Sequence, residues 1–270
     1  MSLVRNAIWL SACWVVVLLA GCAGTPGASS GTAGGRPEIM TESDEPDSRR
    51  RARIRLELAA NYFQQGQTNV ALDELKQALA TDPTYADAYN LRGLVYMRMN
   101  DNALAEDSFR RAVTLNPRDG GALHNYGWLL CQQKRYSESI ALFGRAVAIP
   151  QYADQAKTLM AQGICQISAG QAAEGERSLS QSYELDAGNP ITGYHLSRAL
   201  FQRGDLTRAQ FYIRRVNNSD LARAETLWLG IKVERSLGNR EAMLQLADQL
   251  KKRFGQSSEA AAYARGAFNE

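Results

Sequence analysis

The strongest constraint on this chain of 270 residues is an internal repeat of about 34 residues. A small side chain recurs at steps of 34, 34, 36, 34 and 33 residues, at Ala59, Gly93, Gly127, Gly163, Ser197 and Gly230. A second small position follows 12 residues after each, at Ala71, Ala105, Ser139, Gly175, Ala209 and Ala242. Both sets lie in stretches whose apolar residues have helical spacing. The pattern predicts pairs of antiparallel helices that cross closely at the small residues.

Two further features recur in the same phase. Bulky side chains stand four residues after each second small position, at Leu75, Phe109, Phe143, Leu179, Ile213 and Leu246. Pro83, Pro117 and Pro150 end second helices, because proline lacks the amide donor and clashes with the preceding turn. A 34-residue helix-turn-helix unit is the signature of the tetratricopeptide repeat. The sequence therefore predicts an all-α fold, a right-handed superhelical solenoid of about six such repeats, with the alanine-rich residues 257–268 as a capping helix.

The N-terminus has the pattern of a bacterial lipoprotein. Arg5 precedes an apolar run over residues 7–20, which is shorter than the ~20 residues that a spanning helix needs. The sequence Leu-Ala-Gly before Cys22 resembles a lipobox, whose cysteine accepts a diacylglycerol. The alternatives are a plain signal peptide or a single-pass anchor with a chance cysteine. We predict a signal peptide over residues 1–21, a lipidated Cys22 with a flexible tether over 22–51, and a repeat domain over 52–270.

The tether carries no periodic apolar face, so burial cannot offset the entropy of ordering it. A basic run follows it, formed by Arg49, Arg50, Arg51, Arg53 and Arg55. This run could contact anionic lipid or lipopolysaccharide. We favour the alternative, in which it is the solvated first turn of a helix.

In a tetratricopeptide solenoid the first helix of each repeat lines the concave face. The residues that we predict to form a protein-binding groove on this face are Leu94, Met97, Trp128, Met160, Ile164, Tyr194 and Phe201. The same phase also places His124, Leu227 and Ile231 on it. The set is apolar for a surface, which favours an amphipathic or extended hydrophobic peptide as ligand. The alternative is that several of these side chains belong to the core between repeats; for the large, central Trp128 we favour contact with a partner.

No motif in the sequence indicates catalysis or metal binding. His124 and His195 have no His-Glu-x-x-His or Cys-x-x-Cys partner, and no nucleophile elbow or glycine-rich phosphate loop is visible. We therefore expect no enzyme, no metal and no cofactor other than the lipid on Cys22. A net charge of +3 gives no case for nucleic acid. Cys131 and Cys165 lie on first helices of adjacent repeats; a disulfide is one option, and we favour two small buried apolar side chains.

Two stretches carry a resemblance to a known family: residues 125–136, Asn-Tyr-Gly-Trp-Leu-Leu-Cys-Gln-Gln-Lys-Arg-Tyr, and residues 229–232, Leu-Gly-Ile-Lys. With the lipobox, the tether and the six repeats, they resemble the type IV pilus biogenesis and stability lipoproteins, the PilW/PilF group, from Cys22 to about Phe254. Position 131 is usually aromatic in that group, so Cys131 is a departure that leaves the local shape of the groove open.

The resemblance implies an outer-membrane, periplasm-facing lipoprotein, a pilotin that helps the type IV pilus secretin reach the membrane, assemble and persist. Ala23 after the lipidated cysteine agrees with the outer membrane, since enteric-type retention in the inner membrane uses an acidic residue there. The partners expected are thus the secretin and the outer membrane, with no nucleic acid and no small-molecule substrate. The alternative function is a periplasmic lipoprotein adaptor that scaffolds cell-wall hydrolases or outer-membrane assembly factors.

Overall fold

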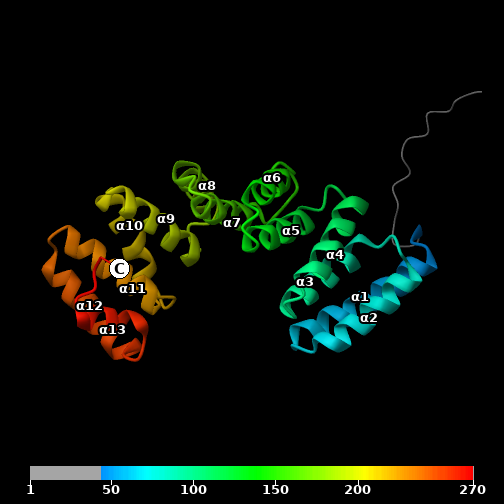
Figure 1. Cartoon of the computed structure of the whole chain (residues 1–270), viewed down its shortest axis with the longest axis horizontal. Helices are drawn as coiled ribbons and strands as arrows, with labels where there is room; N and C mark the ends of the chain where they lie inside the picture. Colours follow the sequence, from blue (N-terminus) through cyan, green and yellow to red (C-terminus); the bar gives the residue numbers. More distant parts are fainter. Residues whose placement is uncertain (1–43, 270) are drawn as a thin grey trace, which may run out of the picture. The chain divides into compact units, whose positions relative to one another are not determined.

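The structure is a computed structural model that describes residues 44–269, and a compact unit begins at Glu45. The described residues form thirteen α-helices and no strand (Figure 1). Their bounds are α1 Asp47–Gln64, α2 Thr68–Thr81, α3 Ala86–Arg98, α4 Asn102–Leu115, α5 Gly120–Gln132, α6 Tyr136–Val147, α7 Gln155–Ser168, α8 Ala172–Leu185, α9 Pro190–Arg203, α10 Leu206–Asn217, α11 Ala224–Ser236, α12 Arg240–Phe254 and α13 Ser258–Arg265. None of these helices has the length and apolar character that crossing a membrane requires.

Twelve of the helices form six consecutive pairs, from α1 with α2 to α11 with α12. Each second helix packs on the first helix of the next pair, and each first helix also contacts the first helix of the next repeat. Helix α13 packs against α11 and α12 at the end of the array. The predicted solenoid of six repeats with a capping helix is therefore confirmed. Contact between successive first helices gives the array one continuous face, on which the groove was predicted.

The turn inside each repeat depends on one residue with a left-handed backbone. Its φ lies between 61° and 87° in every repeat, at Gly66, Asn100, Lys134, Gly170, Gly204 and Gly238. Glycine adopts this conformation without a Cβ penalty, and asparagine tolerates it better than most residues. Lys134 is the exception, since it has no such advantage. These six residues fix the register of the repeats independently of the helix crossings.

The small residues of the repeat lie where the two helices of a pair cross. A Cβ added to Gly127 would lie 2.9 Å from the ring of Phe143, which is fully buried. In the fourth repeat the approach is closer, because both helices carry glycine. A Cβ on Gly163 would lie 2.9 Å from the carbonyl oxygen of Gly175, and one on Gly175 would lie 2.8 Å from that of Gly163. The predicted reason for the small residues is thus confirmed.

The sixth repeat is one residue away from the phase that the sequence analysis assigned to it. The left-handed residue advances by 34 positions from Gly204 to Gly238, so the register is unbroken. In that register α11 places Ile231 at the position of the earlier small residues, while α12 places Ala247 at the bulky position. Ile231 and Ala247 are buried in one apolar cluster. Gly230 nevertheless faces the bulky Leu246 as predicted, since a Cβ added to it would lie 3.0 Å from that side chain. The shift therefore shows in which other residues of α11 are buried.

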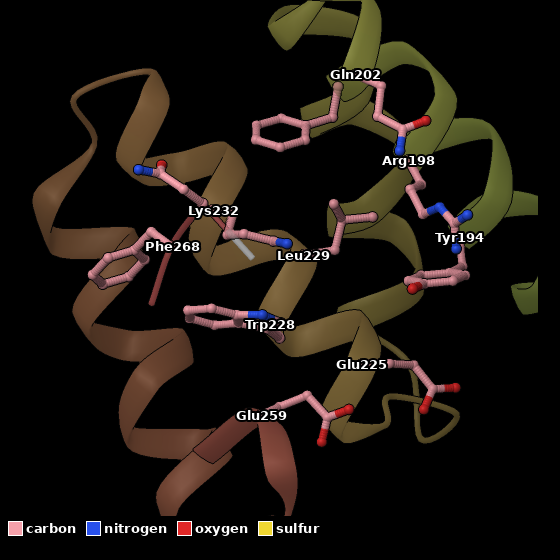
Figure 2. Close-up of a pocket in the computed structure, with 11 residues that line it drawn as sticks. Tyr194, Arg198, Gln202, Glu225, Trp228, Leu229, Lys232, Glu259 and Phe268 are labelled. Carbon is pink, nitrogen blue, oxygen red and sulfur yellow. The ribbon is translucent and has the colours of Figure 1, made fainter. Parts of the chain in front are cut away.

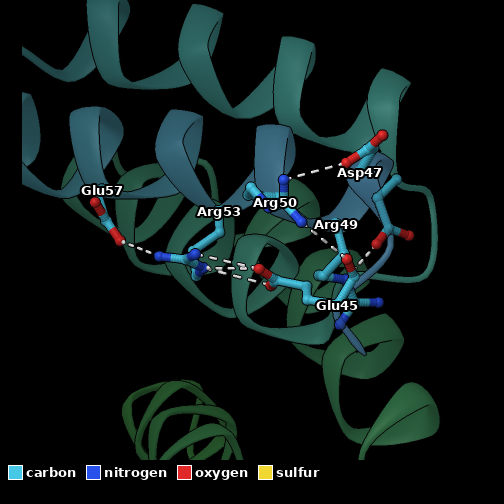
Figure 3. A network of polar contacts seen from close by, with 7 residues as sticks. Glu45, Asp47, Arg49, Arg50, Arg53 and Glu57 are labelled. Carbon is cyan, nitrogen blue, oxygen red and sulfur yellow. Dashed lines mark hydrogen bonds and ion pairs between the residues drawn. The ribbon is translucent and has the colours of Figure 1, made fainter. Parts of the chain in front are cut away.

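The basic run belongs to helix α1, which starts five residues before the boundary placed at residue 52 (Figure 3). The repeat domain therefore begins earlier than predicted. Four of the five arginines of the run are held by acids of the chain itself: Arg53 by Glu45 and Glu57, Arg50 by Asp47, Arg55 by Glu74, and Arg49 by Asp82. The preferred interpretation of the run, as the first turns of a helix, is confirmed. The signal peptide, Cys22 and most of the predicted tether lie outside the described residues.

A candidate protein-binding face on the first helices

Three positions of each first helix form one stripe, at ten, six and three residues before the left-handed turn residue. Residues with this spacing project from the same side of an α-helix. We call the stripe the first-helix face. It comprises Leu56, Ala60 and Phe63 on α1, Asn90, Leu94 and Met97 on α3, His124, Trp128 and Cys131 on α5, Met160, Ile164 and Ile167 on α7, Tyr194, Arg198 and Phe201 on α9, and Trp228, Lys232 and Arg235 on α11.

All seven predicted groove residues lie on this face and are half-buried. Leu94 and Met97 pack against a cluster around Phe109, and Trp128 packs against one around Phe143. Met160, Ile164, Tyr194 and Phe201 pack against a third cluster, which extends from repeat four to repeat six. Each side chain therefore both contributes to packing between repeats and retains exposed apolar surface. Whether they contact a partner remains a prediction.

Two other residues that the sequence phase placed on the face are buried instead. Leu227 and Ile231 are 0% exposed, because the one-residue shift in repeat six turns them inward and puts Trp228 and Lys232 on the face. These two placements were wrong, and the equal spacing of Gly204 and Gly238 was the signal that could have found Trp228 and Lys232. His124 has its predicted place in the stripe, but it is 7% exposed and, like Trp228 at 8%, is largely covered by its neighbours.

The two histidines are held neutral by burial. The Nδ1 atom of His124 lies 2.9 Å from the hydroxyl of Thr158, which is also 2.9 Å from the hydroxyl of Tyr152. Burial, with a smaller contribution from Lys157, lowers the pKa of His124 to about 4. Burial and the neighbouring Arg198 lower the pKa of His195 to about 4 as well. No group of His, Cys, Asp or Glu in the described part of the chain is arranged to hold a metal ion.

Cys131 and Cys165 form a disulfide between α5 and α7, with a Cα–Cα distance of 5.9 Å. The preferred prediction, two unlinked buried side chains, was wrong. Contact between first helices of adjacent repeats brings the two Cα atoms within the range that a disulfide can bridge. Cys131 stands beside Trp128 in the same cluster, so the disulfide fixes this part of the face against the next repeat.

The first-helix face ends in a pocket of about 570 Å³ at the C-terminal repeats (Figure 2). Helix α9 contributes Tyr194, Arg198 and Phe201 to its lining, and α11 contributes Trp228 and Lys232. Glu259 of the capping helix and the segment after it complete the wall. In that segment Phe268 packs on Trp228, with ring centroids 5.3 Å apart, and the Arg235 guanidinium lies 3.9 Å from the Phe268 ring centroid. The cap therefore helps to build the pocket as well as covering the core.

Charges are separated within this pocket. Figure 2 shows Arg198 and Lys232 on one side of the Trp228 ring and Glu225 and Glu259 on the other. Burial, and then repulsion by Arg198, lower the pKa of Lys232 below its ordinary value. The arrangement offers an aromatic surface between a cationic and an anionic edge, a chemistry suited to binding a peptide.

Known proteins resemble the chain over most of its length. Models of the tetratricopeptide repeat match residues 61–100 and 90–156. The type IV pilus assembly protein PilF of Pseudomonas aeruginosa is 26% identical over 228 residues, which are 84% of this chain and 89% of that protein.

Solved structures agree with the sequence match. The structure of PilW, described as a widely conserved type IV pilus biogenesis factor, superposes with a TM-score of 0.73 at 29% identity, covering 79% of this chain and 98% of that one. The structure of P. aeruginosa PilF shares the fold, with a TM-score of 0.76 at 23% identity, 82% of this chain and all of that chain. This chain is therefore a solenoid of tetratricopeptide repeats that is similar in sequence to PilF, a type IV pilus assembly protein, and similar in structure to PilW, a type IV pilus biogenesis factor.

Proposed function

We propose that this chain is an outer-membrane lipoprotein, a pilotin, that binds the type IV pilus secretin and promotes its localisation, multimerisation and stability. Its first-helix face supports this proposal most directly, because it presents half-buried apolar side chains in five consecutive repeats. The relatives support it as well, since their names place them in pilus assembly and biogenesis. The role requires binding and no catalysis.

Binding is centred on Trp128 in this proposal. The disulfide beside it and the packing against Phe143 hold its ring in place before any partner arrives. A side chain that is already ordered loses little conformational entropy on binding, so more of the contact energy appears as affinity. Leu94 on one side and Ile164 on the other extend the apolar surface along the array. A hydrophobic segment of the secretin, helical or extended, fits such a surface.

The membrane anchor in this proposal is the lipid on Cys22. Acyl chains contribute roughly 0.8 kcal/mol per buried CH₂, and the several chains of a lipoprotein exceed the two signals needed for stable anchoring. We expect Cys22→Ala to leave a folded protein that no longer fractionates with the outer membrane. Metabolic labelling with palmitate tests this directly: incorporation into wild type and none into Cys22→Ala supports the anchor, while equal incorporation contradicts it.

Binding of the purified secretin periplasmic region tests the proposed partner. We expect Trp128→Ala to weaken binding by about 2 kcal/mol or more, the scale of a hot-spot truncation. A matched control is Phe211→Ala, because Phe211 on α10 is an aromatic side chain 59% exposed and off the first-helix face. Calorimetry should show unchanged affinity for the control, and circular dichroism should show that both variants fold. Equal affinity of both variants would place the secretin elsewhere, and binding of cell-wall hydrolases in its place would favour an adaptor.

A further inference from the structure

We infer that the C-terminal pocket of the first-helix face is a second docking site, for a protein segment in which an apolar side chain stands next to an aspartate or glutamate. The pocket is the one lined by Tyr194, Arg198, Phe201, Trp228 and Lys232. The inference rests on the proposal that the first-helix face binds a protein. The inference adds two properties of the bound segment: it is acidic where it lies over repeats five and six, and it therefore has a defined direction along the array.

The chemistry of the face changes along the array at equivalent positions. Six residues before the left-handed turn, the side chain is apolar in repeats two, three and four, at Leu94, Trp128 and Ile164, and cationic in repeats five and six, at Arg198 and Lys232. A hydrophobic surface thus passes into a basic one within a single stripe. A partner that covers the whole stripe is complementary when its apolar part lies over repeats two to four and its acidic part over repeats five and six.

The pocket can hold the apolar side chain of such a segment. The rings of Tyr194, Phe201, Trp228 and Phe268 all line it. The Trp228 ring is backed by Phe268 and by Tyr263, at centroid distances of 5.3 Å and 6.4 Å. This backing leaves Trp228 only 8% exposed and keeps the indole in place, so the edge that lines the pocket is rigid, as at binding hot spots.

The cationic edge supplies the acidic preference. The nearby arginines at the end of α9 and on α10 are engaged by the chain's own acids: Arg203 and Arg208 by Glu176, and Arg214 by Glu234. Within the described part of the chain, none of the ion pairs involves Arg198, although it lines the pocket with Lys232. An incoming carboxylate would gain charge-assisted hydrogen bonds at this edge. Glu225 and Glu259, on the other side of Trp228, disfavour the reverse orientation (Figure 2).

A second cavity adjoins the pocket on the side of repeat four. It has a volume of only about 30 Å³, is lined by Ile164, Ile167 and His195, and shares Arg198 and Gln202 with the pocket. The stripe itself continues from Arg198 to Ile164, so a segment leaving the pocket can lie over it toward repeat four. For this reason we assign the carboxylate to an aspartate or glutamate side chain within a segment, and not to a free chain end.

Selection from a random peptide library displayed on phage, with the peptides fused at their C-termini, tests the inference without a known partner. We expect the wild-type chain to enrich peptides in which Asp or Glu adjoins an aromatic or aliphatic residue. The double variant Arg198→Gln, Lys232→Gln should lose this enrichment, while the control Arg177→Gln, whose guanidinium is exposed on α8, should keep it. No enrichment by the wild type, enrichment without acids, or the same acidic enrichment by the double variant would each overturn the inference.

A labelled synthetic copy of an enriched peptide gives the magnitude. Fluorescence anisotropy should show affinity lowered about tenfold in the double variant and lowered further by salt in the wild type, since the contacts are charge-assisted. Unchanged affinity in the double variant with intact circular dichroism contradicts the inference. Trp128→Ala should retain peptide binding. The two proposals can fail separately. If the secretin does not bind but acidic peptides are still enriched, only the proposed function fails. If the secretin binds but acidic peptides are not enriched, only this inference fails.

Discussion

Replacing Gly163 by alanine should destabilise the array although alanine favours helices. The added Cβ would lie 2.7 Å from Cγ of the buried Leu179 and 2.9 Å from the carbonyl oxygen of Gly175. Overpacking of this kind costs about 1–3 kcal/mol, and we take the upper end because one of the contacts is backbone, which cannot rotate away. Alanine in a helix interior returns about 1 kcal/mol relative to glycine. The net expectation is a loss of about 2 kcal/mol in the free energy of unfolding.

Gly144 on α6 provides a matched control, because a Cβ added there would meet nothing within 4 Å. Only the helix-propensity gain applies, so Gly144→Ala should stabilise by up to about 1 kcal/mol. Urea unfolding followed by circular dichroism should therefore separate the two variants by about 3 kcal/mol in opposite directions. If Gly163→Ala were as stable as Gly144→Ala, close crossing of the helices would not be the reason for the small residues of the repeat.

Two further stability predictions follow from the same region. The disulfide joins residues 34 positions apart, so its reduction or Cys131→Ser should lower the free energy of unfolding by about 4 kcal/mol. Unfolding measured with and without dithiothreitol checks this. Equal stability in the two conditions would contradict a native Cys131–Cys165 disulfide. Burial lowers the pKa of His124 to about 4, whereas a histidine in the unfolded chain has a pKa near 6.5. As the pH falls below about 7, the unfolded chain therefore binds a proton that the folded chain does not bind. The free energy of unfolding is thus highest above pH 7 and decreases as the pH drops. Between pH 7.5 and 5 this loss of stability amounts to about 2 kcal/mol. Urea unfolding at the two pH values should show the loss in wild type and a correspondingly smaller loss in His124→Asn. An equal pH dependence in both proteins would contradict the burial of a neutral imidazole.

The sequence predicted the architecture well because tetratricopeptide geometry depends on local features. The small residues at the helix crossings and the turn residues between the helices depend on contacts within one repeat. Both recur in the sequence at the repeat spacing. Repeat six departs from this pattern, because Ile231 and Ala247 stand where the other repeats have a small and a bulky residue. The small residues alone therefore do not show which side of α11 is buried.

The face was harder to predict than the fold. Periodicity tells which side of a helix a residue occupies, but the depth of a side chain depends on the neighbouring repeat. His124 followed the phase of Trp128 and is nevertheless buried, because Thr158 and Tyr152 of the next repeat enclose it. The pocket at Trp228 was missed for two reasons: the phase was one residue out, and Phe268 beyond the last repeat forms part of its wall.

The most direct test of the account is the amount of assembled secretin in the outer membrane of cells that lack this chain and carry either wild type, Trp128→Ala or Phe211→Ala. We expect wild type and Phe211→Ala to restore assembled secretin and pili equally. Trp128→Ala should be present at the wild-type level and yet leave the secretin unassembled. Normal secretin assembly in cells without the chain would contradict the proposed function, and full restoration by Trp128→Ala would contradict the binding face.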